Sequence, residues 1–239
     1  MKLLKAATSP TLHFGSLFLA AAALTACGGG GNPALGSVSG TAAVGAPLAN
    51  ASVQLACKNG TGSATANANG AYKAAFNFDG PCSITASSGA ITIHSFAAGT
   101  GTYNVTPLTQ LLLSYLAGQL GTTVDGLLAG ITSNSSYQSA LTNSTVIANA
   151  EEKVAQLLKT MYGITLSSSS FLTVSFTPGQ PGADSDLDAL LAAGAITGDG
   201  QPVASLAAAA VSAGAASPLP GNASGGATGG TGGTGTTTK

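Results

Sequence analysis

Residues 71–78, Ala-Tyr-Lys-Ala-Ala-Phe-Asn-Phe, carry an apolar side chain at every second position from Tyr72 to Phe78. Lys73 and Asn77 fall on the opposite side of the same stretch. Successive side chains of a strand point to opposite faces of a sheet. This period of two therefore predicts a β-strand with one face on a core and the other in water.

Three further stretches show the same alternation. They are residues 52–57 (Ser-Val-Gln-Leu-Ala-Cys), 82–86 (Cys-Ser-Ile-Thr-Ala) and 91–94 (Ile-Thr-Ile-His). Turn sequences separate the stretches: Gly45-Ala46-Pro47, Lys58-Asn59-Gly60, Asn69-Gly70, Asp79-Gly80-Pro81 and Ser87-Ser88-Gly89. Short alternating strands at this spacing are typical of a small antiparallel β-sandwich.

The first part of this region also carries a spaced set of glycines with one proline and one tyrosine. It reads Gly36-Ser-Val-Ser-Gly, then Gly45-Ala-Pro-Leu-Ala-Asn-Ala-Ser-Val-Gln-Leu55, then Thr65-Ala-Asn-Ala-Asn-Gly70-Ala-Tyr72. This order resembles a carboxypeptidase regulatory-like domain, although Ala66 stands where the family often has Asp. The resemblance covers about residues 37–96. It implies a prealbumin-like β-sandwich and no chemistry, because such sandwiches are accessory modules of unrelated proteins.

From Thr106 onward the apolar period changes to that of a helix. Thr106 is a suitable N-cap, and Pro107 suits the first helical position. Apolar side chains then recur at helical spacing: Leu108, Leu111, Leu112, Tyr115 and Leu116. We expect a helix whose single apolar stripe faces a core, in preference to an open groove.

Four more helices are expected. A short one covers residues 123–131, and a long one begins at a Ser144 cap and stops at Gly163. The long helix has an apolar side of Val146, Ala150, Val154, Leu157, Leu158 and Met161, and an exposed side of Glu151, Glu152, Lys153 and Lys159. The last two cover residues 187–193 and 202–213.

The predicted fold class is α+β, a small antiparallel β-sandwich followed by a helical region. The expected division is a signal peptide (residues 1–26), a Gly-rich tether (27–36), the sandwich (37–105), the helical region (106–213) and a tail (214–239). The tail contains Gly, Thr, Ser, Ala and Pro with almost nothing to bury, so it is predicted to be disordered.

The N-terminus has the features of a secretion signal. Lys2 and Lys5 precede an apolar run of roughly a dozen residues, too short to cross ~30 Å of hydrocarbon. The run closes on Leu24-Thr25-Ala26-Cys27, which resembles a bacterial lipobox, where a signal peptidase cuts before a lipid-modified cysteine. The alternative is an ordinary secretory signal that leaves Cys27 as a free thiol.

The lipobox resemblance implies a location. Cys27 would become the first residue and carry acyl chains such as palmitate, which anchor the chain in a membrane. Gly28 follows where an acidic residue often marks retention in the inner membrane, so the resemblance implies an outer-membrane lipoprotein of the cell envelope. Whether it faces the periplasm or the exterior stays open.

With Cys27 lipidated, Cys57 and Cys82 are the two cysteines that remain. Each lies at the end of a predicted strand, at an inward-facing position. In an oxidising compartment they most simply form a disulfide with each other. Closing the loop of about 25 residues would be worth roughly 3–4 kcal/mol. The alternative is two buried free thiols.

The composition limits the possible partners. Only 6% of the residues are charged and none is arginine, and beyond residue 26 five lysines face eight carboxylates, a net charge near −3. Neutralising nucleic-acid phosphates requires a basic face that this chain cannot assemble. The expected partners are therefore a membrane, through Cys27, and an envelope protein or glycan.

No catalytic or metal site is expected. His94 is the single histidine beyond the signal region, and it lies in a strand with no Gly-x-Ser-x-Gly motif in the chain, so a surface or satisfied sheet histidine is favoured. Asp184, Asp186 and Asp188 resemble the start of a calcium loop, but the sixth and twelfth positions are alanine. Charge near a helix N-terminus is the favoured interpretation of these aspartates.

Two classes of function remain. The leading one is a non-enzymatic, lipid-anchored envelope protein with a binding or structural role. The other is an enzyme, or an accessory of one, that acts on peptidoglycan or an exported polymer. The scarcity of ionisable residues disfavours the enzyme, because acid–base catalysis requires positioned titratable groups. No cofactor is expected.

Overall fold

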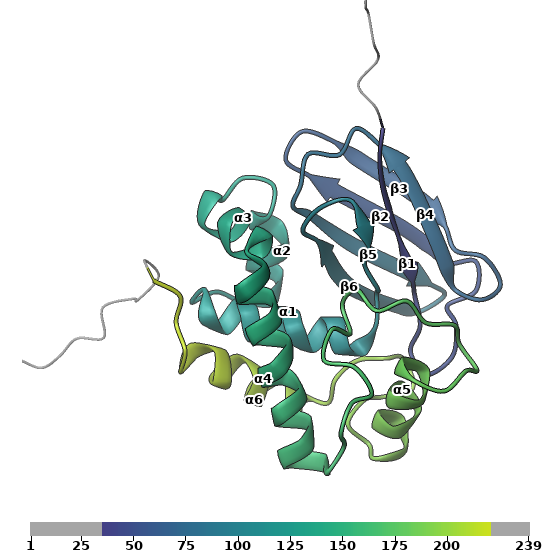
Figure 1. Cartoon of the computed structure of the whole chain (residues 1–239), viewed down its shortest axis with the longest axis vertical. Helices are drawn as coiled ribbons and strands as arrows, with labels where there is room; N and C mark the ends of the chain where they lie inside the picture. Colours follow the sequence, from purple (N-terminus) through teal and green to yellow (C-terminus); the bar gives the residue numbers. More distant parts are fainter. Residues whose placement is uncertain (1–34, 221–239) are drawn as a thin grey trace, which may run out of the picture. The chain divides into compact units, whose positions relative to one another are not determined.

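A computed structural model describes residues 35–220 and shows the α+β fold, with strands first and helices after them (Figure 1). The strands are β1 (Gly36–Thr41), β2 (Ser52–Cys57), β3 (Thr61–Thr65), β4 (Ala71–Phe76), β5 (Cys82–Ser88), β6 (Ile91–Ala97) and β7 (Gly101–Thr102). The helices are α1 (Pro107–Gln119), α2 (Val124–Gly130), α3 (Ser135–Thr142), α4 (Ser144–Tyr162), α5 (Ala183–Ala192) and α6 (Ala204–Ala215).

The strands form two sheets. One has the order β4-β1-β7, and the other is fully antiparallel with the order β3-β2-β5-β6. The alternation predicted for residues 71–78 is confirmed, because Tyr72, Ala74 and Phe76 are buried while Lys73 is exposed. The inward side chains of both sheets belong to one hydrophobic core.

Strand β3 was not predicted. Its sequence, Thr-Gly-Ser-Ala-Thr, contains no large apolar side chain, so the alternation is weak. Gly62 faces the core, where a Cβ atom would lie 2.4 Å from the ring of Phe76. Glycine at this position therefore leaves the space that Phe76 fills, a requirement that the local pattern does not show.

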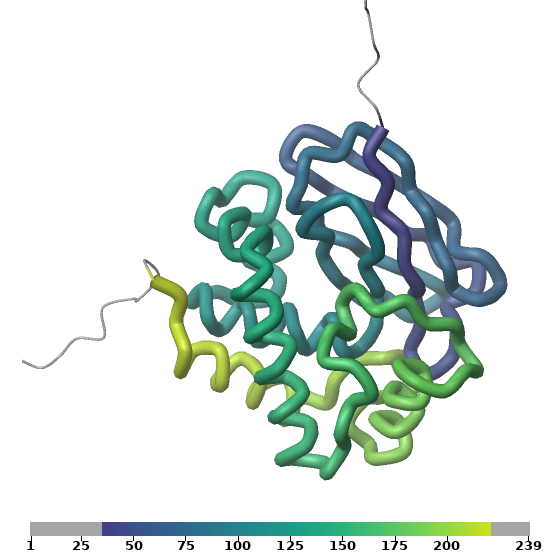
Figure 2. The backbone as a smooth tube through the Cα atoms, viewed as in Figure 1, coloured from purple at the N-terminus to yellow at the C-terminus, as the bar shows by residue number. Residues whose placement is uncertain are grey.

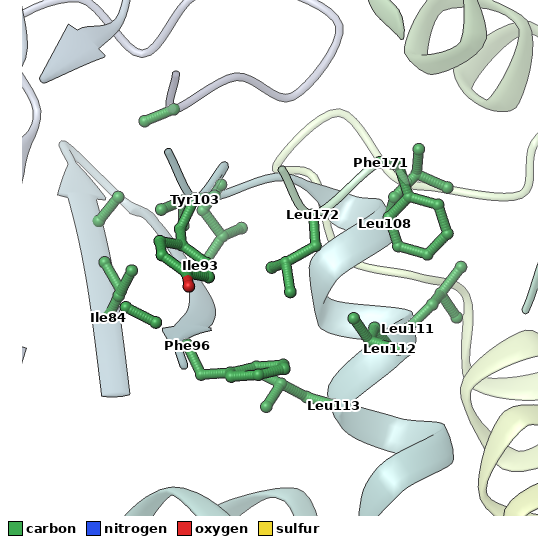
Figure 3. Close-up of a cluster of buried hydrophobic side chains, with 14 of the residues drawn as sticks. Ile84, Ile93, Phe96, Tyr103, Leu108, Leu111, Leu112, Leu113, Phe171 and Leu172 are labelled. Carbon is green, nitrogen blue, oxygen red and sulfur yellow. The ribbon is translucent and has the colours of Figure 1, made fainter. Parts of the chain in front are cut away.

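Helix α1 begins as predicted, with a capping box between Thr106 and Thr109. The predicted single apolar stripe was too narrow, because every residue of this helix except Gln110 is buried. The helix packs against β6, α2, α4 and α6, and so it is covered on all sides. Figure 3 shows Phe96 of β6 beside Leu113 of α1.

The later helices differ in detail from the predictions. Thr123, expected as the first residue of a helix, is the N-cap of α2. Helix α4 is capped by Asn143 instead of Ser144, and the Asn143 side-chain oxygen accepts from two backbone N–H groups. Helix α3 was missed because its first five residues, Ser-Ser-Tyr-Gln-Ser, contain a single large apolar side chain. Helix α5 begins at Ala183, four residues before the predicted start.

The assignment of the exposed side of α4 was partly wrong. Glu151 is only 5% exposed, whereas Met161, placed on the apolar side, is 41% exposed. The chain between α4 and α5 returns to the sandwich (Figure 2), and its Leu172 N–H donates to Glu151 Oε1 at 2.8 Å. Burial of Glu151 follows from this tertiary contact, which the helical period does not encode.

The folded region extends past Gly214, the predicted start of the tail. Gly214 is a buried residue of α6, and Gln119 exchanges hydrogen bonds with the chain that follows, donating to Ser217 O at 3.0 Å and accepting from Leu219 N at 3.2 Å. The predictions for residues 1–34, including lipidation of Cys27, and for residues 221–239 lie outside the described residues. Within residues 35–220, no helix combines the length and the hydropathy needed to cross a bilayer.

Candidate functional site

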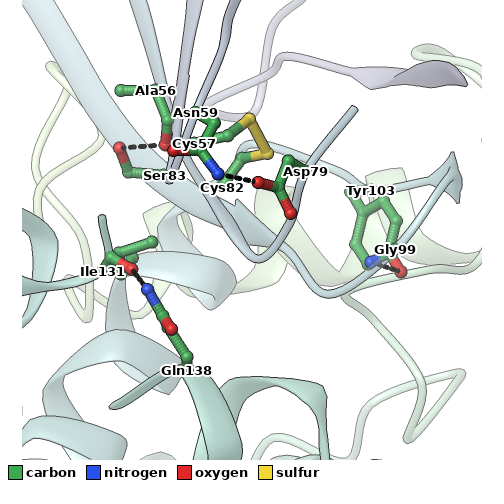
Figure 4. The surroundings of a disulfide bond; sticks show 10 residues. All are labelled: Ala56, Cys57, Asn59, Asp79, Cys82, Ser83, Gly99, Tyr103, Ile131 and Gln138. Carbon is green, nitrogen blue, oxygen red and sulfur yellow. Dashed lines mark hydrogen bonds between the residues drawn. A yellow bond between two sulfur atoms is a disulfide. The ribbon is translucent and has the colours of Figure 1, made fainter. Parts of the chain in front are cut away.

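The two cysteines form a disulfide, as predicted (Figure 4). Cys57 and Cys82 are partners in the register of β2 and β5, and their Cα atoms are 4.1 Å apart. Cys57 is 5% exposed and Cys82 is fully buried, so the bond lies inside the sandwich. Nearby, the Asn59 amide donates to the Asp79 carboxylate and joins the turns at the two ends of the disulfide loop.

The outward side of the sheet β3-β2-β5-β6 carries two parallel rows of uncharged polar side chains. We call these two rows the hydroxyl face. One row is Thr65, Ser52, Ser87 and Thr92, and the other is Ser63, Gln54, Thr85 and His94. Neighbouring strands are about 4.8 Å apart and every second residue of a strand is about 6.7 Å from the last. The hydroxyl face is therefore a regular array of hydrogen-bonding groups.

Side chains within the array bond to each other across the strands. Ser87 Oγ and Thr92 Oγ1 are 3.2 Å apart, and Thr85 Oγ1 lies 3.0 Å from His94 Nδ1. The next outward residues along these strands form a third row, which contains Ser83 and Phe96. Phe96 is fully buried, so we count only the first two rows as surface that a ligand can reach. These hydrogen bonds between neighbours hold the side chains in place. Each side chain still has a donor or an acceptor that a ligand can use.

At the β6 end of the hydroxyl face lies a cleft of about 400 Å³, which we call the His94 cleft. Its polar lining comes from β6, α1, α2 and the turn before α6, namely Thr92, His94, Gln110, Ser114, Asp125 and Gln201. Val124 and Ala207 contribute apolar surface. Both rows of the hydroxyl face end inside this cleft, at Thr92 and His94.

A chain of amide hydrogen bonds fixes the shape of the His94 cleft. The His94 backbone N–H donates to Gln110 Oε1 at 2.7 Å, and Gln110 Nε2 donates to Gln201 Oε1 at 2.7 Å. Gln201 Nε2 donates to the Thr92 carbonyl at 2.8 Å. Because β6 is an edge strand, these side chains satisfy outward backbone groups that would otherwise be free to pair with another strand.

His94 is the sheet histidine that the sequence favours. Its ring is half-buried, and burial lowers its pKa below the usual value, while the negative charge of Asp125 acts in the opposite direction. The partner of Nδ1 is the Thr85 hydroxyl, whereas a Ser-His-Asp triad requires a carboxylate there. This arrangement suits a neutral imidazole that accepts or donates a single hydrogen bond.

The aspartates of the calcium-loop resemblance do not come together around a common point. Asp184 Oδ2 accepts from Gly179 N–H at 2.7 Å, and Asp186 accepts from the backbone and hydroxyl of Ser167, whereas Asp188 is exposed. Asp184 and Asp186 lie in the first turn of α5, as the helix-terminus interpretation predicts. Within residues 35–220, no group of three or more His, Cys, Asp or Glu side chains could hold a metal ion.

Sequence reasoning singled out His94 but missed the residues around it. Gln110, Asp125 and Gln201 carry no motif, and they lie 16 to 107 positions after His94 in the chain. The alternation of β2, β5 and β6 does predict which of their side chains point outward, so the part of the hydroxyl face on these strands could have been found from the sequence once the strand register was known. The part on β3 could not, because the alternation of that strand is weak.

The comparisons with known proteins found no match for this chain. No protein-family model matches the chain, and neither a curated protein nor a solved structure matches it.

Proposed function

We propose that this chain is a lipid-anchored protein of the bacterial cell envelope that binds a neutral glycan and catalyses no reaction. The location rests on the lipobox resemblance at Cys27 and the signal features before it. The binding role rests on the hydroxyl face. The carboxypeptidase regulatory-like resemblance agrees with an accessory module but names no ligand.

The observation that carries the proposal is the uncharged, regular array of the hydroxyl face. Each of its serine and threonine hydroxyls can donate and accept, as can the amide of Gln54, and sugar hydroxyls have the same double capacity. None of the eight side chains is an Asp, Glu or Lys, so a neutral partner meets no charge that must lose its hydration.

The repeat of the array favours a polymer over a small molecule. On adjacent strands of this face, four side chains are exposed and so open to a long ligand: Ser52, Gln54, Ser63 and Thr65. Single hydrogen bonds at such a surface are weak, about 0.5–1.5 kcal/mol each. A glycan with repeated units makes many of them at once, and multivalency raises the overall affinity.

A short tether would hold this surface near the membrane. Residues 27–36 reach at most about 30 Å when fully extended. A Cys27→Ala variant is expected to give an uncleaved or soluble precursor in cell fractionation. Normal processing and membrane association of this variant would overturn the anchoring part of the proposal.

Glycan binding is tested by sedimentation of the full chain with insoluble envelope glycan. The double variant Gln54→Ala/Ser63→Ala removes two groups from the centre of the hydroxyl face, and we expect it to lose at least about tenfold in affinity. The matched control, Gln156→Ala/Ser169→Ala, removes the same two groups from exposed positions in the helical region. Equal retention of the glycan by both double variants would contradict the proposal, provided that their melting temperatures are unchanged.

A further inference from the structure

Unlike the hydroxyl face, the His94 cleft contains a carboxylate side chain. Asp125 stands at its rim, exposed at the start of α2, and the residues that line the cleft include no lysine. Phosphate and carboxylate ligands would meet an uncompensated negative charge there. A ligand rich in hydroxyl donors would instead give the carboxylate charge-assisted hydrogen bonds, which are stronger than neutral ones.

The other polar groups of the cleft are held in place before any ligand arrives. Gln110 and Gln201 bond to each other and to the backbone of β6. Each terminal amide keeps one N–H and acceptor capacity for a ligand. Ser114 donates its hydroxyl proton to the Gln110 carbonyl, so its oxygen remains as an acceptor. Fixed side chains lose little entropy on binding, which favours affinity.

His94 completes the set. Thr85 holds Nδ1 at 3.0 Å, so Nε2 is the ring atom available to a ligand. Val124 and Ala207 provide apolar surface for the C–H face of a ring. A volume of about 400 Å³ lies within the range of small-molecule sites. The cleft therefore combines a carboxylate, two fixed amides, an imidazole and a small apolar patch.

We propose that the His94 cleft binds one or two neutral sugar units through their hydroxyl groups, as the subsite for the end of a glycan that lies on the hydroxyl face. Sugar binding in the cleft is argued from the residues that line it. Only the idea that this sugar is the end of a longer glycan rests on the proposed function. Both rows of the hydroxyl face end at the cleft, so one glycan chain can occupy both surfaces.

The test is calorimetric titration of the full chain with short, soluble, neutral oligosaccharides of glucose, galactose, mannose and N-acetylglucosamine. At least one of these should bind the wild-type chain. Asp125→Asn should lower that affinity about tenfold, because a charge-assisted bond becomes a neutral one. Gln201→Ala should also lower it, because this substitution removes one fixed amide of the cleft and the hydrogen bonds that this amide makes with Gln110 and the Thr92 carbonyl. Asp188→Asn, an exposed aspartate on α5 outside the cleft, is the matched control.

Several results would overturn the inference. One is that no oligosaccharide binds the wild-type chain. Another is that both cleft variants bind as the wild type does. A third is that the corresponding sugar phosphates bind more tightly than the neutral sugars. A different result would contradict the proposed function but not the cleft inference. If Gln54→Ala/Ser63→Ala still sediments with insoluble glycan while Asp125→Asn loses oligosaccharide, the cleft inference stands and the role assigned to the hydroxyl face falls.

Discussion

Glu151 is a carboxylate buried in the middle of α4, with a backbone N–H as its hydrogen-bond partner. Burial raises its pKa to about 7, although the bond from the Leu172 N–H acts in the opposite direction. A pKa above that of the unfolded chain means that the native state favours the protonated form. Its stabilising contribution is therefore complete below about pH 4.5 and is lost as the pH rises through 7.

We predict that Glu151→Gln stabilises the protein at pH 8 relative to the wild type, by up to about 3 kcal/mol, and has little effect at pH 4. The measurement is urea unfolding at a series of pH values, with Glu152→Gln, an exposed neighbour, as the control. His94, whose pKa is lowered, contributes the opposite slope, but it is present in both proteins and cancels in their difference. A constant difference between wild type and Glu151→Gln across this range would refute the prediction.

At the scale of elements, the crossing of α1 and α6 is closer than ordinary side chains allow. A Cβ atom on Gly118 would lie 2.1 Å from the Val211 carbonyl oxygen, and one on Gly214 would lie 2.0 Å from the Tyr115 carbonyl oxygen. Both obstacles are backbone atoms, which a rotamer change cannot move. The two glycines therefore set the distance between these helices.

We predict that Gly118→Ala lowers the free energy of unfolding by about 1–3 kcal/mol, because the helices must separate to admit the methyl group. Alanine is otherwise the better helix former, so intrinsic propensity alone predicts a gain at this position. Gly198→Ala is the control, since a Cβ atom there meets nothing within 4 Å. Denaturant melts compare the two variants, and equal stability of both would show that the crossing can relax.

At the scale of the whole molecule, the sandwich and the helices share one core. Asn104, which is fully buried after the last strand, accepts from Thr41 N–H and donates to the carbonyls of Phe171 and Val174. It thereby joins β1 to the chain between α4 and α5. Separation of the sandwich from the helices would break the two bonds to Phe171 and Val174, each worth about 0.5–1.5 kcal/mol net.

We predict that limited proteolysis leaves one fragment from about residue 36 to at least Pro220. Truncation after Pro220 should leave the melting temperature unchanged, because residues 221–239 contain almost no apolar side chain. Truncation after Ala213 should lower it, because the chain then loses Gly214 and the two hydrogen bonds to Gln119. A stable fragment that ends near Thr106 would contradict this view and show two independent domains.

The sequence by itself determined the features that depend on neighbouring residues. The alternation around Tyr72, the capping of α1 at Thr106 and the change of period that follows are local, and they predicted the α+β fold. The pairing of Cys57 with Cys82 was also predictable, because the two lie at the ends of strands and the lipobox resemblance assigns Cys27, the third cysteine, to lipidation.

Only the tertiary structure decided which distant residues meet. Burial of Glu151 requires Leu172, and the His94 cleft requires Gln201, which lies more than 100 residues beyond Thr92. Gly214 lies in a stretch of small residues, and nothing in that stretch marks it as different from its neighbours. Its close approach to the backbone of α1 nevertheless leaves no room for a Cβ atom. The physical reason is the same in each case. Hydrogen-bond partners and close backbone contacts between distant segments are set by packing, and local propensity carries no signal for them.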